Sequence, residues 1–210
     1  MEKCIIFGAA AMCRLAAPIE NGDYLIAADG GLRHFDAIGR KPHAILGDFD
    51  SLGYVPQSAE VFPVEKDDTD MMLAVRHGLE RGYREFHLYG AFDGSRLDHT
   101  VANFQTLAFL QTHGARGYLI GRQYIATVIQ NETVRFPAAC SGIVSVFCMG
   151  EAATGVCIRG LKYPLENGTL SSDFPLGVSN HFEGAEAEIS VKNGKLLLLW
   201  NTENGLPAVW

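Results

Sequence analysis

The hydrophobic rhythm of the chain changes near residue 121, and this change constrains the fold more than any other feature. Before that point, short β-rich runs alternate with helix-length amphipathic segments, which is typical of a parallel sheet covered by helices. The apolar spacing within 71–79 and 97–108 predicts two helices, each with one buried face. Strands are expected at 4–9, 24–28, 44–46, 61–64, 86–89 and 118–120.

After residue 121 the apolar runs become short and alternating, and Gly, Pro and Asn separate them. Such runs, at 124–129, 133–136, 143–147, 155–158, 188–191 and 196–200, predict a small antiparallel sandwich or barrel. Asn193-Gly194 predicts a two-residue hairpin between the last two. The expected fold class is therefore α/β, with an N-terminal three-layer parallel-sheet domain over 1–121 and a C-terminal all-β sandwich or barrel over 122–210.

Composition excludes several classes of protein. The 17 Lys and Arg against 24 Asp and Glu give a net charge of −7, and no basic run offers a footprint for nucleic acid. The longest apolar run, residues 4–13, is about half the length of a membrane-spanning helix, so no membrane segment is expected. Five widely spaced cysteines without a Cys-x-x-Cys pair indicate reduced thiols and a cytoplasmic location.

Familiar phosphate and zinc motifs are missing from the sequence. No two glycines stand at i and i+2, so the dinucleotide-binding Gly-x-Gly-x-x-Gly cannot be present, and the Walker A loop is absent. No two histidines lie within four residues of each other, which excludes the His pair of a zinc hydrolase helix. A chain that handles phosphates without these motifs must do so by another route.

Acidic residues follow four of the predicted strands. In a parallel sheet the carboxyl ends of the strands share one edge, where open α/β sheets bind their ligands. A single acid there could cap a helix or form a turn, but a crowd of carboxylates repels itself unless a cation lies among them. The acidic segments are Asp29-Gly30-Gly31, Asp48-Phe49-Asp50-Ser51, Glu65-Lys66-Asp67-Asp68-Thr69-Asp70, and Asp93 to His99.

Carboxylate oxygens with few basic neighbours favour Mg²⁺, with Mn²⁺ as the alternative. Mg²⁺ usually binds together with substrate phosphates, so a nucleoside di- or triphosphate is the expected partner. Asp48 and Asp50 could turn toward one ion, and Gly30-Gly31 would let backbone N–H groups approach a phosphate. Lys66 and Arg96 could contact phosphate or pair with neighbouring acids, and the sequence leaves both open.

These motifs, in this order, resemble the thiamine pyrophosphokinase family over nearly the whole chain. Six segments together make the resemblance specific. They are Ala28-Asp29-Gly30-Gly31; Gly47-Asp48-Phe49-Asp50-Ser51; Lys66-Asp67-Asp68-Thr69-Asp70; Gly94-Ser95-Arg96-Leu97-Asp98-His99 with Asn103; Leu161-Lys162-Tyr163-Pro164-Leu165; and Gly177-Val178-Ser179-Asn180-His181-Phe182.

The resemblance implies a homodimer that transfers diphosphate from ATP to thiamine, with its active site near the subunit interface, an ATP domain first and a thiamine and dimerisation domain second. Asp48, Asp50, Asp70 and Asp98 would be the catalytic and Mg²⁺-binding carboxylates, with Asp70 or Asp98 as a possible base. The resemblance assigns ATP to Asp29, Gly30, Gly31, Ser51, Lys66, Asp67, Thr69, Arg96, His99 and Asn103. It assigns thiamine to Ser179, Asn180 and Trp200, while Tyr163 replaces the Trp of human-type members.

Two other functions stay open at this point. A metal-dependent phosphohydrolase would use the same acidic edge to activate water, but it would not need the β-rich second half with its Ser179-Asn180 loop. A non-catalytic nucleotide or vitamin sensor would bind nucleotide and Mg²⁺ and leave ATP intact. Turnover of ATP therefore distinguishes the enzymes from the sensor.

Overall fold

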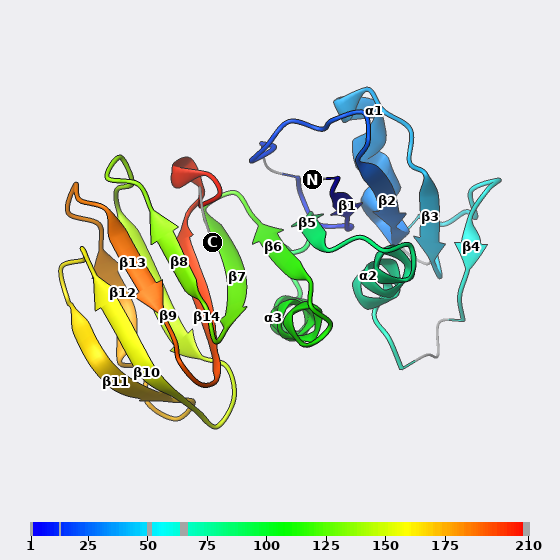
Figure 1. The fold of residues 1–210 in the computed structure, drawn as a ribbon. Coiled ribbons are helices and arrows are strands. Elements are labelled where there is room, and N and C mark those ends of the chain that lie inside the picture. Colours follow the sequence, from blue (N-terminus) through cyan, green and yellow to red (C-terminus); the bar gives the residue numbers. More distant parts are fainter. Residues whose placement is uncertain (1, 13, 50–51, 64–66, 208–210) are drawn as a thin grey trace. The chain divides into compact units, whose positions relative to one another are not determined.

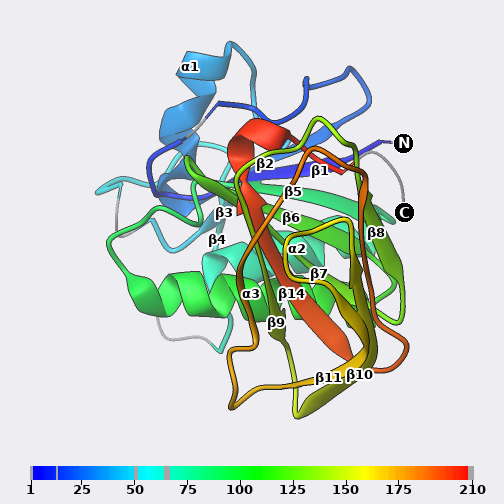
Figure 2. The same ribbon diagram turned by 90° about the vertical axis from the view of Figure 1, so that its left-hand side faces the viewer.

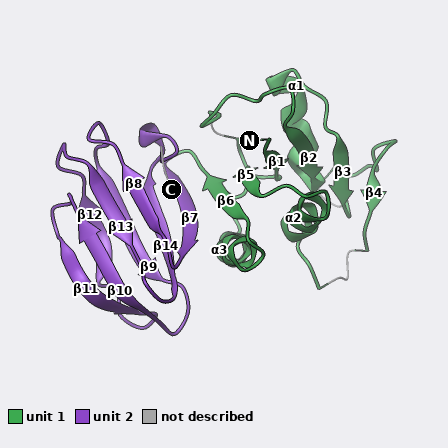
Figure 3. Ribbon diagram, viewed as in Figure 1, with its two compact units in different colours: residues 1–122 green, residues 123–210 purple. Residues whose placement is uncertain are grey.

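The computed structural model describes residues 2–12, 14–49, 52–63 and 67–207, and it divides into two compact units, residues 1–122 and 123–210 (Figure 3). Sheets and helices occur together, so the predicted mixed α/β class is confirmed. The division falls one residue after the boundary expected from the sequence, residue 121. The two units are described separately below.

The first unit is built on a parallel sheet of six strands in the order β6-β5-β1-β2-β3-β4 (Figure 1). The central strands are buried along almost their whole length, as expected for a sheet covered on both faces. The expected strand at 61–64 is represented by a two-residue strand, and residue 64 lies outside the described residues. The strands are β1 (Cys4–Phe7), β2 (Tyr24–Ala28), β3 (Ala44–Gly47), β4 (Glu60–Val61), β5 (Glu85–Tyr89) and β6 (Arg116–Ile120).

Helices α2 (Asp70–Glu80) and α3 (Leu97–Thr112) lie together on one side of this sheet, as Figure 2 shows. The 3₁₀ helix η1 (Asp29–His34) and the short helix α1 (Phe35–Ile38) lie on the other side. Thr69 caps α2, because its hydroxyl oxygen accepts a hydrogen bond from the Met72 N–H at 3.2 Å. This cap fixes Asp70 as the first residue of the helix.

The chain passes from β1 to β2, β3 and β4 on one side of β1, and places β5 and β6 on the other. The strand order therefore reverses between β1 and β5. In open α/β sheets the crevice beyond the carboxyl ends of the strands at such a reversal is the usual ligand site. In this sheet the loops that follow β1 and β5 leave the strands at the point of reversal.

The second unit contains two antiparallel four-stranded sheets, β12-β9-β14-β7 and β11-β10-β13-β8. Aromatic rings join the sheets, since Phe136 packs against Trp200 with ring centroids 5.4 Å apart and against Phe182 at 5.2 Å. The strands are β7 (Tyr124–Gln130), β8 (Thr133–Phe136), β9 (Ile143–Cys148), β10 (Ala152–Arg159), β11 (Leu165–Ser171), β12 (Gly177–His181), β13 (Ala187–Ser190) and β14 (Lys195–Asn201), followed by the 3₁₀ turn η2 (Thr202–Asn204).

The prediction of a two-residue hairpin at Asn193-Gly194 is wrong. Strand β13 pairs with β10 and β8, whereas β14 pairs with β7 and β9, so the turn carries the chain from one sheet to the other. The backbone of Asn193 bonds instead to Thr154 of β10, with N···O distances of 2.8 and 3.1 Å. Long-range strand pairing has overridden the local turn signal here.

No helix among the described residues is long and apolar enough to cross a membrane. Cys4, Cys140, Cys148 and Cys157 are free thiols, and Cys13 lies outside the described residues. Burial raises the pKa of the Cys4 thiol far above its ordinary value, so this thiol stays protonated.

Candidate active site

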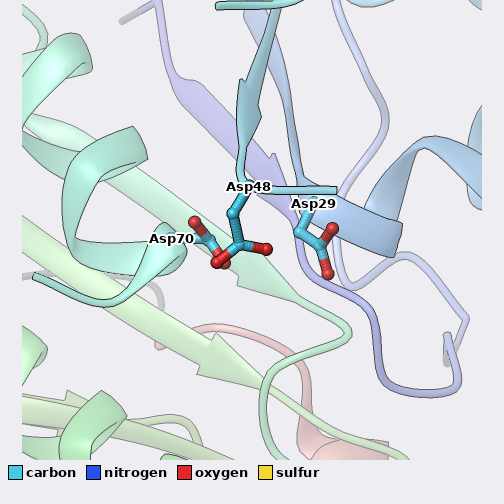
Figure 4. Close-up of side chains that lie close together, drawn as sticks. All are labelled: Asp29, Asp48 and Asp70. Atoms are coloured by element: carbon cyan, nitrogen blue, oxygen red, sulfur yellow. The ribbon is translucent and has the colours of Figure 1, made fainter. Parts of the chain in front are cut away.

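Three carboxylates meet at the carboxyl edge of the parallel sheet (Figure 4). Asp29 follows β2, Asp48 follows β3, and Asp70 begins α2. One oxygen from each lies within 4.8 Å of the others, Asp29 being buried and the other two half-buried. The sheet and the first turn of α2 thus bring together acids that are up to 41 positions apart in the sequence. These three residues are called the carboxylate trio below.

The backbone around the trio is held in uncommon conformations. Asp29 has φ of 47° and Phe49, next to Asp48, has φ of 62°, values that side chains other than Gly, Asn and Asp rarely adopt. Gly47 has φ of 152°, and a Cβ atom there would lie 3.0 Å from Asp29 Cα. The end of β3 therefore passes close to Asp29, which aims Asp48 at its neighbour. Strained backbone of this kind concentrates at functional sites.

A second close approach fixes the turn that carries Asp29. A Cβ atom at Gly31 would lie 1.8 Å from the carbonyl oxygen of Phe7, so η1 is pressed against the end of β1. Gly30 and Gly31 are both buried. The glycine pair is thus required for packing, which is independent of the phosphate contact that the sequence also suggested.

The trio fits a divalent cation. Three carboxylates within 4.8 Å of one another repel unless positive charge lies among them, and the Oδ1 atoms of Asp29 and Asp70 are buried away from screening water. Three hard oxygen donors and no thiol or imidazole form the ligand set that Mg²⁺ prefers. Asp29, Asp48 and Asp70 are therefore the residues that would hold such an ion.

The trio contains two of the four metal ligands expected from the sequence, Asp48 and Asp70. Asp50 lies outside the described residues. Asp29, which the sequence assigned to ATP, takes the third place in the trio. The signal for it was its position directly after a strand, which it shares with Asp48.

Asp98 lies outside the trio, and it forms an ion pair with Arg96. The Arg96 Nη2 donates to Asp98 Oδ2 at 2.6 Å, and both side chains are about two-thirds exposed, at 67% and 65%. The hydrogen bond from Arg96 lowers the pKa of Asp98, which makes its carboxylate a weaker base. Of the two readings that the sequence left open for Arg96, the structure contains the pairing with a neighbouring acid.

The other predicted ATP residues of the first unit fall into four groups. Asn103 is buried, and its Nδ2 donates to the Ala91 carbonyl at 2.7 Å, which ties α3 to the loop after β5. Thr69 is the cap of α2. Asp67 and His99 are exposed to solvent, while Ser51 and Lys66 lie outside the described residues.

Of the predicted thiamine residues in the second unit, Asn180 lines a cavity of about 120 Å³. Its side chain ties β12 to the segment between β10 and β11. The Asn180 Oδ1 accepts from the Tyr163 N–H at 2.9 Å, and its Nδ2 donates to the Tyr163 carbonyl at 2.7 Å. Ser179 beside it is exposed and has φ of 58°. The cavity is lined mainly by apolar side chains, namely Ile158, Tyr163, Pro164, Leu165, Leu170, Leu176 and Val178.

Trp200 does not reach this cavity. Its side chain is fully buried in the aromatic core of the second unit, at 0% exposure, and its indole N–H donates to the Gly205 carbonyl at 2.8 Å. Tyr163 is the exposed aromatic residue at the cavity, with 57% of its surface accessible. The ring available to stack on a ligand is therefore that of Tyr163.

The first unit has a parallel sheet with an acidic trio at its carboxyl edge, and the second is a β unit with an apolar cavity. These features define a class of two-unit α/β proteins with a candidate metal-dependent active site. A family profile described as the catalytic domain of thiamin pyrophosphokinase matches residues 15–119. A second profile, described as the vitamin B1 binding domain of thiamin pyrophosphokinase, matches residues 131–196. The chain belongs to the thiamin pyrophosphokinase family.

The sequence identity between this chain and individual proteins of the family is low. A thiamine pyrophosphokinase of Bacillus subtilis is 26% identical over 178 residues, which is 77% of this chain and 79% of that protein. A crystal structure of the Bacillus subtilis enzyme has the same fold, with a TM-score of 0.84, 23% identity and coverage of 96% of this chain and 100% of its own. The structure of a thiamin pyrophosphokinase from Geobacillus thermodenitrificans has a TM-score of 0.76 at 26% identity, covering 95% and 96% of the two chains.

Proposed function

We propose that this chain transfers the terminal diphosphoryl group of ATP to the hydroxyl of thiamine, giving thiamine diphosphate and AMP. The observation that carries the proposal is the carboxylate trio at the edge of the parallel sheet, in a chain that belongs to this family. The match to a vitamin B1 binding domain supports a second substrate site, which a simple phosphohydrolase would not need. The family match likewise favours a transferase over a sensor.

The proposal divides the work between the two units. The first, a three-layer parallel-sheet unit, would bind ATP and Mg²⁺, and the second, a β-sandwich, would bind thiamine. The trio would hold Mg²⁺, which neutralises charge on phosphate oxygens when it is bound. Because metal and alignment supply most of the catalysis in such transfers, a strong base is not required. Asp70 and Asp98 stay the candidates if a base acts, but Arg96 lowers the pKa of Asp98 and Asp70 would be a ligand of Mg²⁺, so neither would be a strong base.

The reaction products test this proposal. Attack on the β-phosphorus releases AMP, whereas ordinary kinase chemistry releases ADP. Incubation with ATP, Mg²⁺ and thiamine should give AMP and thiamine diphosphate in equal amounts by chromatography, and neither should form without thiamine or metal. ADP with thiamine monophosphate would contradict the reaction type, and free phosphate formed without thiamine would support a hydrolase.

The cavity beside Asn180 is the proposed thiamine site. It is apolar with a small polar rim, and the exposed Tyr163 ring borders it, which suits a planar heteroaromatic ligand. Ser179 lies next to Asn180 with its hydroxyl-bearing side chain exposed. The two side chains therefore have different expected roles, Ser179 as a direct contact and Asn180 as a contact that also orders the Tyr163 backbone.

Replacing Ser179 or Asn180 by Ala should raise the KM for thiamine by about tenfold, the effect of roughly one lost hydrogen bond at a binding site, and leave the KM for ATP nearly unchanged. Steady-state kinetics with each substrate varied in turn measure this. The matched control is Ser141→Ala, an exposed serine outside the cavity lining. If both KM values rise together and the melting temperature falls, Asn180 acts only by holding the Tyr163 backbone and not by binding thiamine.

A homodimer joined through the second unit is also proposed. Four large apolar side chains are exposed near the cavity: Tyr163, Phe174, Leu176 and Val178, at 57, 63, 53 and 41%. Three of them line the cavity itself, so a partner covering this face would place the thiamine site near the interface. Light scattering at micromolar concentration should report a dimer, and a fully active monomer would contradict the proposal.

A further inference from the structure

We infer that His34 is a positioning residue for the ATP site, where it fixes the loop of residues 8–12 between the carboxylate trio and the segment that carries Arg96 and Asp98. This inference rests on the proposed function. His34 lies outside the trio, and the sequence motifs gave no reason to select it. Its role follows from three features of the structure: two hydrogen bonds, the contacts of the loop, and the element that carries the imidazole.

The imidazole of His34 holds the loop directly. Its Nε2 lies 3.1 Å from the Gly8 carbonyl oxygen and 2.9 Å from the Ala10 carbonyl oxygen. Both partners can only accept, so Nε2 carries the proton and donates to both. From the other side, the Gly8 N–H donates to the carbonyl of Tyr89 in β5 at 2.8 Å, and the Ala10 N–H donates to the carbonyl of Gly90, directly after β5, at 2.9 Å. The loop is thus held from both sides.

The loop lies close to residue 71, which follows the trio member Asp70, and to residue 94, which precedes Arg96 and Asp98. A Cβ atom built on Gly8 would lie 3.1 Å from Cε of Met71, the residue after Asp70. A Cβ atom built on Gly94 would lie 3.3 Å from Ala10 Cβ, and Gly94 begins the segment that leads to Arg96 and Asp98. A shift of the loop would therefore open the space between these two groups of residues.

The same rigid element carries both His34 and a member of the trio. The 3₁₀ helix η1 begins at Asp29 and ends at His34, and Gly31 within it is pressed against the end of β1. The six residues of η1 therefore link the loop, which His34 holds, to the carboxylate of Asp29. The loop also follows β1 directly, at the point where the strand order reverses between β1 and β5, which is the usual place for a ligand in such sheets.

Steady-state kinetics of three variants test the inference. His34→Ala should raise the KM for ATP by about tenfold, the factor expected for roughly one to two lost hydrogen bonds, and change the KM for thiamine by less than about twofold. His34→Gln keeps a side-chain N–H donor and should bring the KM for ATP back to within about threefold of the wild type. The control is His113→Ala, because the His113 Nδ1 atom bonds locally at the end of α3, to the Phe109 carbonyl at 2.8 Å and the Thr112 hydroxyl at 3.3 Å.

Hydrogen exchange separates this inference from the proposed function. Without any substrate, amide exchange in a peptide spanning residues 7–14 should be faster in His34→Ala than in the wild type and restored in His34→Gln. If the wild type forms no AMP, the proposed function fails, while the exchange result still decides whether His34 holds the loop. Unchanged exchange in His34→Ala, an unchanged KM for ATP, or an equal rise in both KM values would overturn the inference.

Discussion

Asp48→Asn should lower the rate of AMP formation by at least about 100-fold at saturating ATP and thiamine, because it removes one negative ligand from the trio that we propose as the Mg²⁺ site. The substitution keeps the size of the side chain and one of its oxygens. The loss of rate would therefore report the charge and not a change of packing. Raising the Mg²⁺ concentration should recover part of the activity, since a weakened site can still be filled by mass action.

The same variant should be more stable without metal. Asp48 shares with Asp29 and Asp70 a space in which their oxygens lie within 4.8 Å of one another, so neutralising one of them relieves repulsion. A gain of about 1 kcal/mol would raise the melting temperature by roughly 2–4 °C in a chain of this size. Adding Mg²⁺ should stabilise the wild type more than the variant.

Asp36→Asn is the matched control for this experiment. It makes the same chemical change in the same unit, at an exposed position on α1 outside the trio. It should leave the rate and the response to Mg²⁺ unchanged. Near wild-type turnover of Asp48→Asn at limiting Mg²⁺ would show that the trio is not the metal site.

The parallel sheet could be predicted because its strands are continuous apolar runs and the intervening helices repeat their apolar residues at helical spacing. These are local signals, and they also placed the acids at one edge. That Asp29 joins Asp48 and Asp70 depends on the positive φ of Asp29 and on the close passage of Gly47. The first is a backbone conformation and the second a tertiary contact, and the position of Asp29 after a strand does not by itself reveal either of them.

In the second unit it was harder to predict which side of its sheet each strand residue points to. Residues 196–200 read Leu-Leu-Leu-Leu-Trp, so they lack the alternation that tells an inward from an outward side chain. The family resemblance assigned Trp200 to thiamine, and this run gave no alternation against which to check the assignment. In the structure its ring packs on Phe136 of the opposite sheet, a contact that depends on how the two sheets face each other.

Gly31→Ala should destabilise the first unit and abolish most of the activity. The added methyl carbon would lie 1.8 Å from the Phe7 carbonyl oxygen and 2.4 Å from its carbonyl carbon, both backbone atoms of the central strand β1. Because backbone atoms cannot turn aside as a side chain can, η1 and β1 must separate. Overpacking of this kind should cost about 3 kcal/mol or more, which lowers the melting temperature by roughly 6–12 °C.

In Gly31→Ala the rate of AMP formation should fall further than the loss of stability alone explains. Asp29 stands two residues before Gly31 on the same 3₁₀ helix, so a displaced η1 carries its carboxylate away from Asp48 and Asp70. The rate should therefore be reduced even at temperatures where circular dichroism shows the variant to be folded. Gly22→Ala is the control, because the three atoms nearest to its new methyl all belong to the flexible Glu2 side chain. A Gly31→Ala protein that melts and turns over like this control would show that η1 can move without disturbing the trio.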